Sequence, residues 1–148
     1  MRRRPGGAPT VYVVAGTPDV QSAALGVRAE GNLGPAESAS LERAIRDCPP
    51  ELLPDFLLLK GHVLSQSAAT RQDLIRATWP FLRIVAHMPD DPRAAEGLLE
   101  TAVLLGRIGN RDKAAALLAE CLAHAGARAE TRRRAEEVIK ELEDASSF

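Results

Sequence analysis

Residues 90–127 read DDPRAAEGLLETAVLLGRIGNRDKAAALLAECLAHAGA and give the clearest indication of how this chain folds. Asp91 and Pro92 favour a helix start, because aspartate can cap free amides and proline fits the first turn. Gly109 and Asn110 end that helix. A second helix follows, with small or apolar residues at Ala114, Leu118, Cys121 and Gly126. The stretch is therefore expected to form a helical hairpin of about 34 residues, a length typical of helical repeats.

A weaker copy of this hairpin is expected near the start of the chain. Thr17 and Pro18 favour the beginning of a helix over residues 18–30. Glycine and proline in residues 31–35 break the chain, and a second helix follows that ends before Cys48. The apolar stripe of this second helix consists of Leu41, Ala44 and Ile45. Together these two helices are expected to make the first hairpin.

Another copy lies between the first hairpin and residues 90–127. Its first helix is expected to start at Pro54 and to end at residues 65–67. Its second helix starts at Thr70, which has the spacing of a reciprocal capping pair with Asp73. Pro80 is awkward there, because an internal proline removes a hydrogen bond and clashes with the preceding turn at about 3 kcal/mol. Either the helix kinks at Pro80 or a new element starts there.

Trp79 is the one tryptophan of the chain. An exposed tryptophan is a common anchor at protein interfaces. Its apolar neighbours Ile75, Phe81 and Leu82 favour a buried position instead. We therefore interpret Trp79 as a core residue.

Residues 128–148 are expected to be a C-terminal capping helix with a frayed tail from Ala145. The helix has a narrow apolar stripe of Ala135, Val138, Ile139 and Leu142. Charged residues, including Arg132, Arg133 and Arg134, cover the remainder and are expected to face solvent. Such a helix can seal the exposed end of a helical stack. The alternative is that it pairs with a second copy, which would make the protein a homodimer.

Composition limits the kinds of partner. The 148 residues are 45% hydrophobic and 26% charged, with a net charge of -1, so neither nucleic acid nor a membrane surface is an expected partner. Residues 1–16 are interpreted as a flexible basic tail with a short strand at Thr10–Val14, without an export signal. Cys48 and Cys121 lack the spacing of a disulfide framework or a zinc site. We expect a cytoplasmic protein.

The sequence does not indicate an enzyme. His62, His87 and His124 lie on different expected elements and lack metal-ligand spacing. We find no nucleophile elbow, no phosphate-binding glycine loop and no paired cysteine and histidine. We expect no catalytic residue, no metal site and no cofactor.

The hairpins resemble the tetratricopeptide (TPR) repeat family. In residues 90–127 the matching positions are Leu98, Ala102, Leu105, Gly109, Ala114, Leu118 and Cys121. In the preceding copy they are Leu57, Gly61, Leu64, Phe81 and Pro89. The resemblance implies an all-α solenoid of about three hairpins over residues 17–127, followed by the capping helix.

The resemblance also implies a function. TPR proteins bind partners in a concave groove that the first helix of each hairpin lines. The positions that correspond to this groove are Asp55, Leu58, His62, Gln66, Glu96, Leu99, Val103 and Arg107. The protein would be a non-catalytic adaptor or scaffold that binds a peptide or helix of a protein partner. The cation cluster that some family members use to bind a terminal carboxylate is not present, since its positions hold His62, Val103 and Leu59.

An alternative α/β fold explains other features. Residues 10–31 also resemble the first strand and helix of a response-regulator receiver domain, with its flavodoxin-like sheet. Residues 56–59 and 81–85 would then be later parallel strands. The positions of the receiver's acidic pair, phosphoacceptor and lysine hold Ala15, Gly16, Lys60 and Arg107. This fold would imply a pseudo-receiver that signals without phosphorylation.

Overall fold

The structure is a computed structural model that describes residues 35–146. Its elements in chain order are α2 (Pro35–Asp47), the short 3-10 helix η1 (Pro50–Leu52), α3 (Leu53–Ser67), α4 (Arg71–His87), α5 (Pro92–Ile108), α6 (Arg111–Ala123) and α7 (Ala129–Ser146). No strand occurs among residues 35–146. The fold is all-α and built from helical hairpins, as expected.

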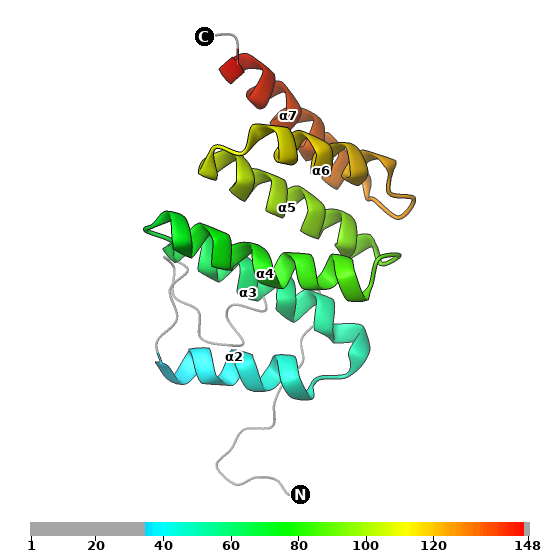
Figure 1. The fold of residues 1–148 in the computed structure, drawn as a ribbon. Helices are drawn as coiled ribbons and strands as arrows, with labels where there is room; N and C mark the ends of the chain where they lie inside the picture. Colours follow the sequence, from blue (N-terminus) through cyan, green and yellow to red (C-terminus); the bar gives the residue numbers. More distant parts are fainter. Residues whose placement is uncertain (1–34, 147–148) are drawn as a thin grey trace, which may run out of the picture.

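The helices stack in chain order from α2 to α7 (Figure 1). Helices α3 and α4 form one antiparallel hairpin, and α5 and α6 form the next. Helix α4 packs against both α3 and α5 and so joins the two hairpins. Helix α7 packs against α5 and α6 and covers the end of the stack, while α2 packs against α3. The expected second and third hairpins and the capping helix are therefore confirmed.

Local hydrogen bonds explain where the helices of the last hairpin start and stop. Asp91 Oδ1 accepts from the Arg93 amide at 2.8 Å and caps α5. Gly109 ends α5 with a φ of 99°, a left-handed conformation that favours glycine, and the Asn110 amide donates to the Leu105 carbonyl at 2.9 Å. Asn110 then caps α6 through the Lys113 amide. The cap at Asp91 and the helix end at Gly109 are those that the sequence predicts, whereas the Asn110 cap of α6 was not predicted.

Helix α4 starts with the predicted capping box. The Asp73 amide donates to the Thr70 hydroxyl at 3.1 Å, and the Asp73 carboxylate accepts from the Thr70 amide at 3.1 Å. The helix then continues through Pro80 to His87, so the interpretation that a new element starts at Pro80 is wrong. The buried Thr78 hydroxyl donates to the Ile75 carbonyl at 2.6 Å just before the proline.

The receiver-like alternative is not favoured by these helices. Residues 56–59 lie inside α3 and residues 81–85 lie inside α4, so their interpretation as parallel strands is wrong. Their dense apolar pattern reflects helices that are buried on more than one side. The expected strand at Thr10–Val14 and the expected helix over residues 18–30 lie outside the described residues.

The buried side chains form two clusters along the stack. The first lies among α2, α3, α4 and the start of α5, around Phe56, Leu57, Phe81 and Ile84. The second lies among α5, α6 and α7, around Leu99, Leu118, Cys121 and Ala135. Val138, Ile139 and Leu142 pack against the second cluster, which confirms the apolar stripe of α7.

Helix α7 extends further than expected. Ala145 is helical rather than frayed, because α7 continues to Ser146, and residues 147–148 lie outside the described part. Within residues 35–146, no helix has the length and apolar character needed to cross a lipid bilayer.

Candidate partner-binding cleft

The helices that the sequence assigns to a groove lie in one row. Helix α5 packs against α3 on one side and against α7 on the other, whereas α4 and α6 do not pack directly on each other. The side of the described stack formed by α3, α5 and α7 is therefore the tighter one, meaning that alternate helices contact each other directly on that side. All eight candidate groove residues lie on two helices of this row. Helix α3 contains Asp55, Leu58, His62 and Gln66, and α5 contains Glu96, Leu99, Val103 and Arg107.

Two candidate groove residues are buried in the core. Leu99 has an exposed fraction of 0% and Leu58 of 6%. Leu58 packs in the first hydrophobic cluster and Leu99 in the second. The structure therefore corrects their assignment to a partner-contacting surface, because a side chain inside the core contacts its own chain rather than a partner.

Asp55 links two helices through an ion pair. Its Oδ2 accepts from Arg93 Nη1 at 2.7 Å, and Arg93 Nε also donates to Asp91 Oδ1 at 2.8 Å. The three side chains are less than a quarter exposed, and the guanidinium of Arg93 lowers the pKa of Asp91. Asp55 therefore connects the start of α3 to the start of α5 and is already engaged.

His62, Gln66 and Glu96 remain accessible to different extents. The His62 ring lies edge-on to Phe81, with ring centroids 5.4 Å apart and an interplanar angle of 76°. Gln66 is exposed near the end of α3. Glu96 is half-buried, and both burial and the neighbouring Glu100 raise its pKa.

Side chains from three parts of the fold oppose that shift. Arg128, His62 and Arg134 each lower the pKa of Glu96, although less than burial raises it. His62 belongs to α3 and Arg134 to α7. The carboxylate of Glu96 on α5 thus lies in the electrostatic range of both neighbouring helices of the row.

An ion pair between α5 and α7 was not predicted. Arg134 Nη1 lies 2.9 Å from Glu100 Oε2, and the Glu100 side chain is only 10% exposed. The sequence interpretation placed Arg134 among the solvent-facing residues of α7, and this is wrong for one of its guanidinium nitrogens. Sequence spacing could not indicate this contact, since 34 positions separate the two residues.

Val103 and Arg107 lie together in a surface cleft between α5 and α7. We call it the α5/α7 cleft, and its volume is about 230 Å³. Its lining residues are Ala102, Val103, Gly106 and Arg107 from α5, and Val138, Glu141 and Leu142 from α7. The cleft therefore combines an apolar lining with one cation and one anion, contributed by opposite walls.

The α7 wall of this cleft was missed in the sequence. Val138, Glu141 and Leu142 have i, i+3 and i+4 spacing, which places them on one face of a helix. The sequence interpretation assigns Val138 and Leu142 to the capping stripe of the last hairpin, and Glu141 to the charged residues outside it. Val138 and Leu142 do pack against the second cluster, and together with Glu141 they also form one side of the cleft.

Two further observations bear on chemistry. Among residues 35–146 no group of three or more histidine, cysteine, aspartate or glutamate side chains is arranged to hold a metal ion. Cys48 and Cys121 are free thiols, and burial raises the pKa of both.

Comparison of the chain with protein families, with curated proteins and with solved structures found no match.

Proposed function

We propose that this protein is a non-catalytic protein-interaction module of the cytoplasm, an adaptor or scaffold that binds a peptide or helix of a protein partner. The α5/α7 cleft is the observation that carries the proposal, because it lies on the tighter row of helices and includes two residues assigned to a groove from sequence. The proposal includes the TPR assignment, which the two stacked hairpins and their capping helix support.

The size of the cleft favours a side chain over a small-molecule substrate. Its volume of about 230 Å³ is below the roughly 300–1,000 Å³ of small-molecule sites. Val103, Val138 and Leu142 can surround one apolar side chain of a peptide. Arg107 and Glu141 can bind charged or backbone groups beside it.

The polar residues of the row that remain at least partly accessible extend this site. Glu96 lies two helical turns before Val103 on α5, and His62 and Gln66 lie on the neighbouring α3. Asp55, Leu58 and Leu99 are not part of the proposed contact surface, because the first is paired with Arg93 and the other two are buried. The proposed partner site thus keeps only part of the residue set that the sequence predicts for the groove.

A crosslinking experiment tests the proposal in cells that naturally make the protein. A photoreactive phenylalanine analogue at position 103 or 107 should crosslink to a defined partner. The same analogue at Ala116, an exposed position of α6 outside the cleft, serves as the matched control. Equal crosslinking from all three positions, or none from 103 and 107, would contradict a partner site in the α5/α7 cleft.

A charge substitution tests the contribution of the cleft directly. Arg107→Glu removes the cation of the cleft and places a second carboxylate there beside that of Glu141, so it should weaken capture of the partner identified by crosslinking about tenfold or more. Arg111→Glu makes the same charge change at the exposed start of α6 and should leave capture unchanged.

A further inference from the structure

Trp79 is exposed at the surface of α4. Its exposed fraction is 60%, the larger of the two values among the exposed large hydrophobic side chains in residues 35–146, and Leu82 beside it is 38% exposed. The interpretation of Trp79 as a core residue is therefore wrong. The buried face of α4 contains Ala77, Phe81 and Ile84 instead. A tryptophan left in water exposes a large apolar area that a partner can cover.

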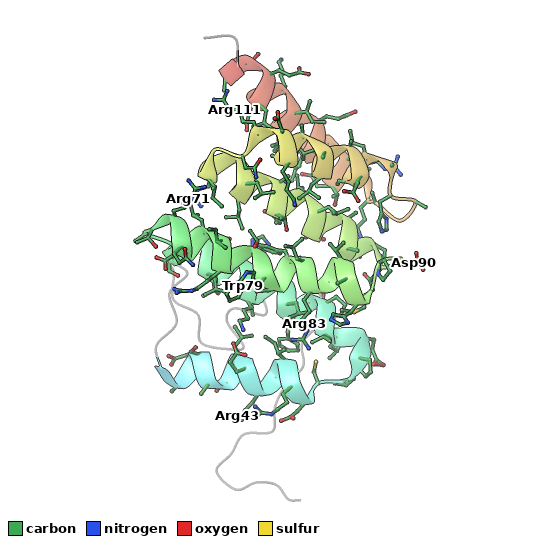
Figure 2. All side chains as sticks on the ribbon, in the orientation of Figure 1. Arg43, Arg71, Trp79, Arg83, Asp90 and Arg111 are labelled. Carbon is green, nitrogen blue, oxygen red and sulfur yellow. The ribbon has the colours of Figure 1, made fainter. Side chains whose placement is uncertain are left out.

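Trp79 lines a pocket between α3 and α4, which we call the Trp79 pocket. Its volume is about 300 Å³, and it is lined by Leu57, Lys60, Leu64, Arg76, Trp79, Pro80 and Arg83. Figure 2 shows Trp79 and Arg83 on the side of α4 toward α2. The four α4 residues have i, i+3, i+4 and i+7 spacing, so they form one face of the helix.

Three cations surround the apolar part of the pocket. Lys60 Nζ lies 2.6 Å from Glu42 Oε2 of α2, and Arg76 Nη1 lies 3.6 Å from Asp73 Oδ1. Arg83 has no ion pair among the described residues. The Arg76 and Arg83 side chains are exposed on either side of Trp79 along α4. The rim is therefore net basic, in a chain whose net charge is -1.

We propose that the Trp79 pocket binds an acidic segment of a partner protein that carries one large apolar side chain. The apolar side chain would pack against Trp79 and Leu64, above the buried Leu57. Carboxylates on both sides of it would pair with Arg76 and Arg83, because these guanidinium groups flank the indole. This site shares no residue with the α5/α7 cleft and does not depend on the function proposed for it.

Other occupants fit less well. The phosphates of a nucleic acid could meet the cations, but they offer no apolar side chain to cover Trp79 and Leu64. The chain before α2 contains Arg2, Arg3, Arg4 and Arg28 against Asp19 and Glu30, so it is net basic, like the rim. Charge complementarity therefore favours an acidic partner over this segment of the chain itself.

Tryptophan fluorescence of the full chain tests the proposal, because Trp79 is the one tryptophan in it. The probe is a synthetic acetylated hexapeptide with two central leucines and two glutamates on each side. It should produce a saturable blue shift of Trp79 emission. A peptide with lysines in place of the glutamates, and one with serines in place of the leucines, should each bind at least about tenfold more weakly.

Paired variants locate the contact. Arg76→Glu combined with Arg83→Glu should abolish the shift, and circular dichroism should remain unchanged because both side chains are exposed. Arg111→Glu, at the start of α6, should bind the peptide as the natural chain does. A shift that persists in the double variant would overturn the proposal.

Three other results would also overturn it. A blue-shifted, quencher-protected emission of the free monomer would show that the chain itself covers Trp79. Emission that depends on protein concentration would assign the pocket to a second copy. Tighter binding of a short single-stranded DNA than of the acidic peptide would assign it to nucleic acid.

Discussion

Gly61 on α3 lies directly against the ring of Phe81 on α4. A Cβ atom at Gly61 would lie 2.5 Å from Phe81 Cε1 and 2.6 Å from Cε2. Phe81 is fully buried, so its ring has no free space in which to move. This contact determines how closely the two helices of the hairpin approach, and α5 approaches the same residue, since a Cβ at Gly97 would lie 2.8 Å from the Phe81 carbonyl oxygen.

Gly61→Ala should destabilise the fold by about 1–3 kcal/mol, because overpacking a filled core forces side chains and backbone to shift. Urea unfolding followed by circular dichroism measures this change. Gly106→Ala on α5 is the matched control, since its Cβ would meet only Leu142 Cδ2 at 3.5 Å, an ordinary contact. That variant should gain about 0.5–1 kcal/mol from lower chain entropy. A neutral or stabilising Gly61→Ala would contradict the close packing described here.

Thr101→Val should stabilise the protein by about 1 kcal/mol. The Thr101 side-chain oxygen is buried and has no hydrogen-bond partner in the described structure, and valine keeps the shape of the side chain without that polar atom. Thermal unfolding gives the comparison. In Thr78→Val the same change removes a hydroxyl that donates to the Ile75 carbonyl at 2.6 Å, so it should not stabilise. Equal effects in the two variants would argue against an unpaired hydroxyl at Thr101.

Arg134→Met should destabilise the protein by about 1–2 kcal/mol, because it leaves the carboxylate of Glu100 buried without its cation. The figure is below that of a fully buried pair, since the Arg134 side chain is 39% exposed. Adding Glu100→Gln should recover most of the loss. Arg133→Met, on the neighbouring exposed position of α7, should change stability little, because its partners Glu130 and Glu137 are in water. An additive double variant would rule out coupling between Glu100 and Arg134.

Glu96→Gln should stabilise the protein near neutral pH and have no such effect in acid. Burial and Glu100 raise the pKa of Glu96, so the folded state holds its proton at a pH where the unfolded chain releases it. Stability is therefore lost as pH rises from the usual carboxyl pKa through the raised pKa. Unfolding midpoints measured between about pH 3 and pH 8 should diverge over that window. Glu120→Gln, at an exposed position of α6, should run parallel to the natural protein. The same parallel course for Glu96→Gln would show that burial of this carboxyl has no energetic consequence.

Helix positions were readable from the sequence because their causes lie within a few residues. Asp91 and Thr70 cap helices through amides two or three positions further along the chain. Gly109 ends α5 because it adopts a left-handed conformation without a clash. These signals, with the 3.6-residue period of apolar side chains, predicted the second and third hairpins and the capping helix.

Exposure and pairing required the neighbours that the fold brings together. Leu58 and Leu99 have groove spacing on their own helices, yet adjacent helices bury both, while Trp79 has apolar neighbours in sequence and still faces solvent. The Glu100–Arg134 pair and the α5/α7 cleft join residues more than thirty positions apart. Periodicity reports which face of a helix is apolar, but only the packing of other helices on that face determines which of its residues are covered and which can meet a partner.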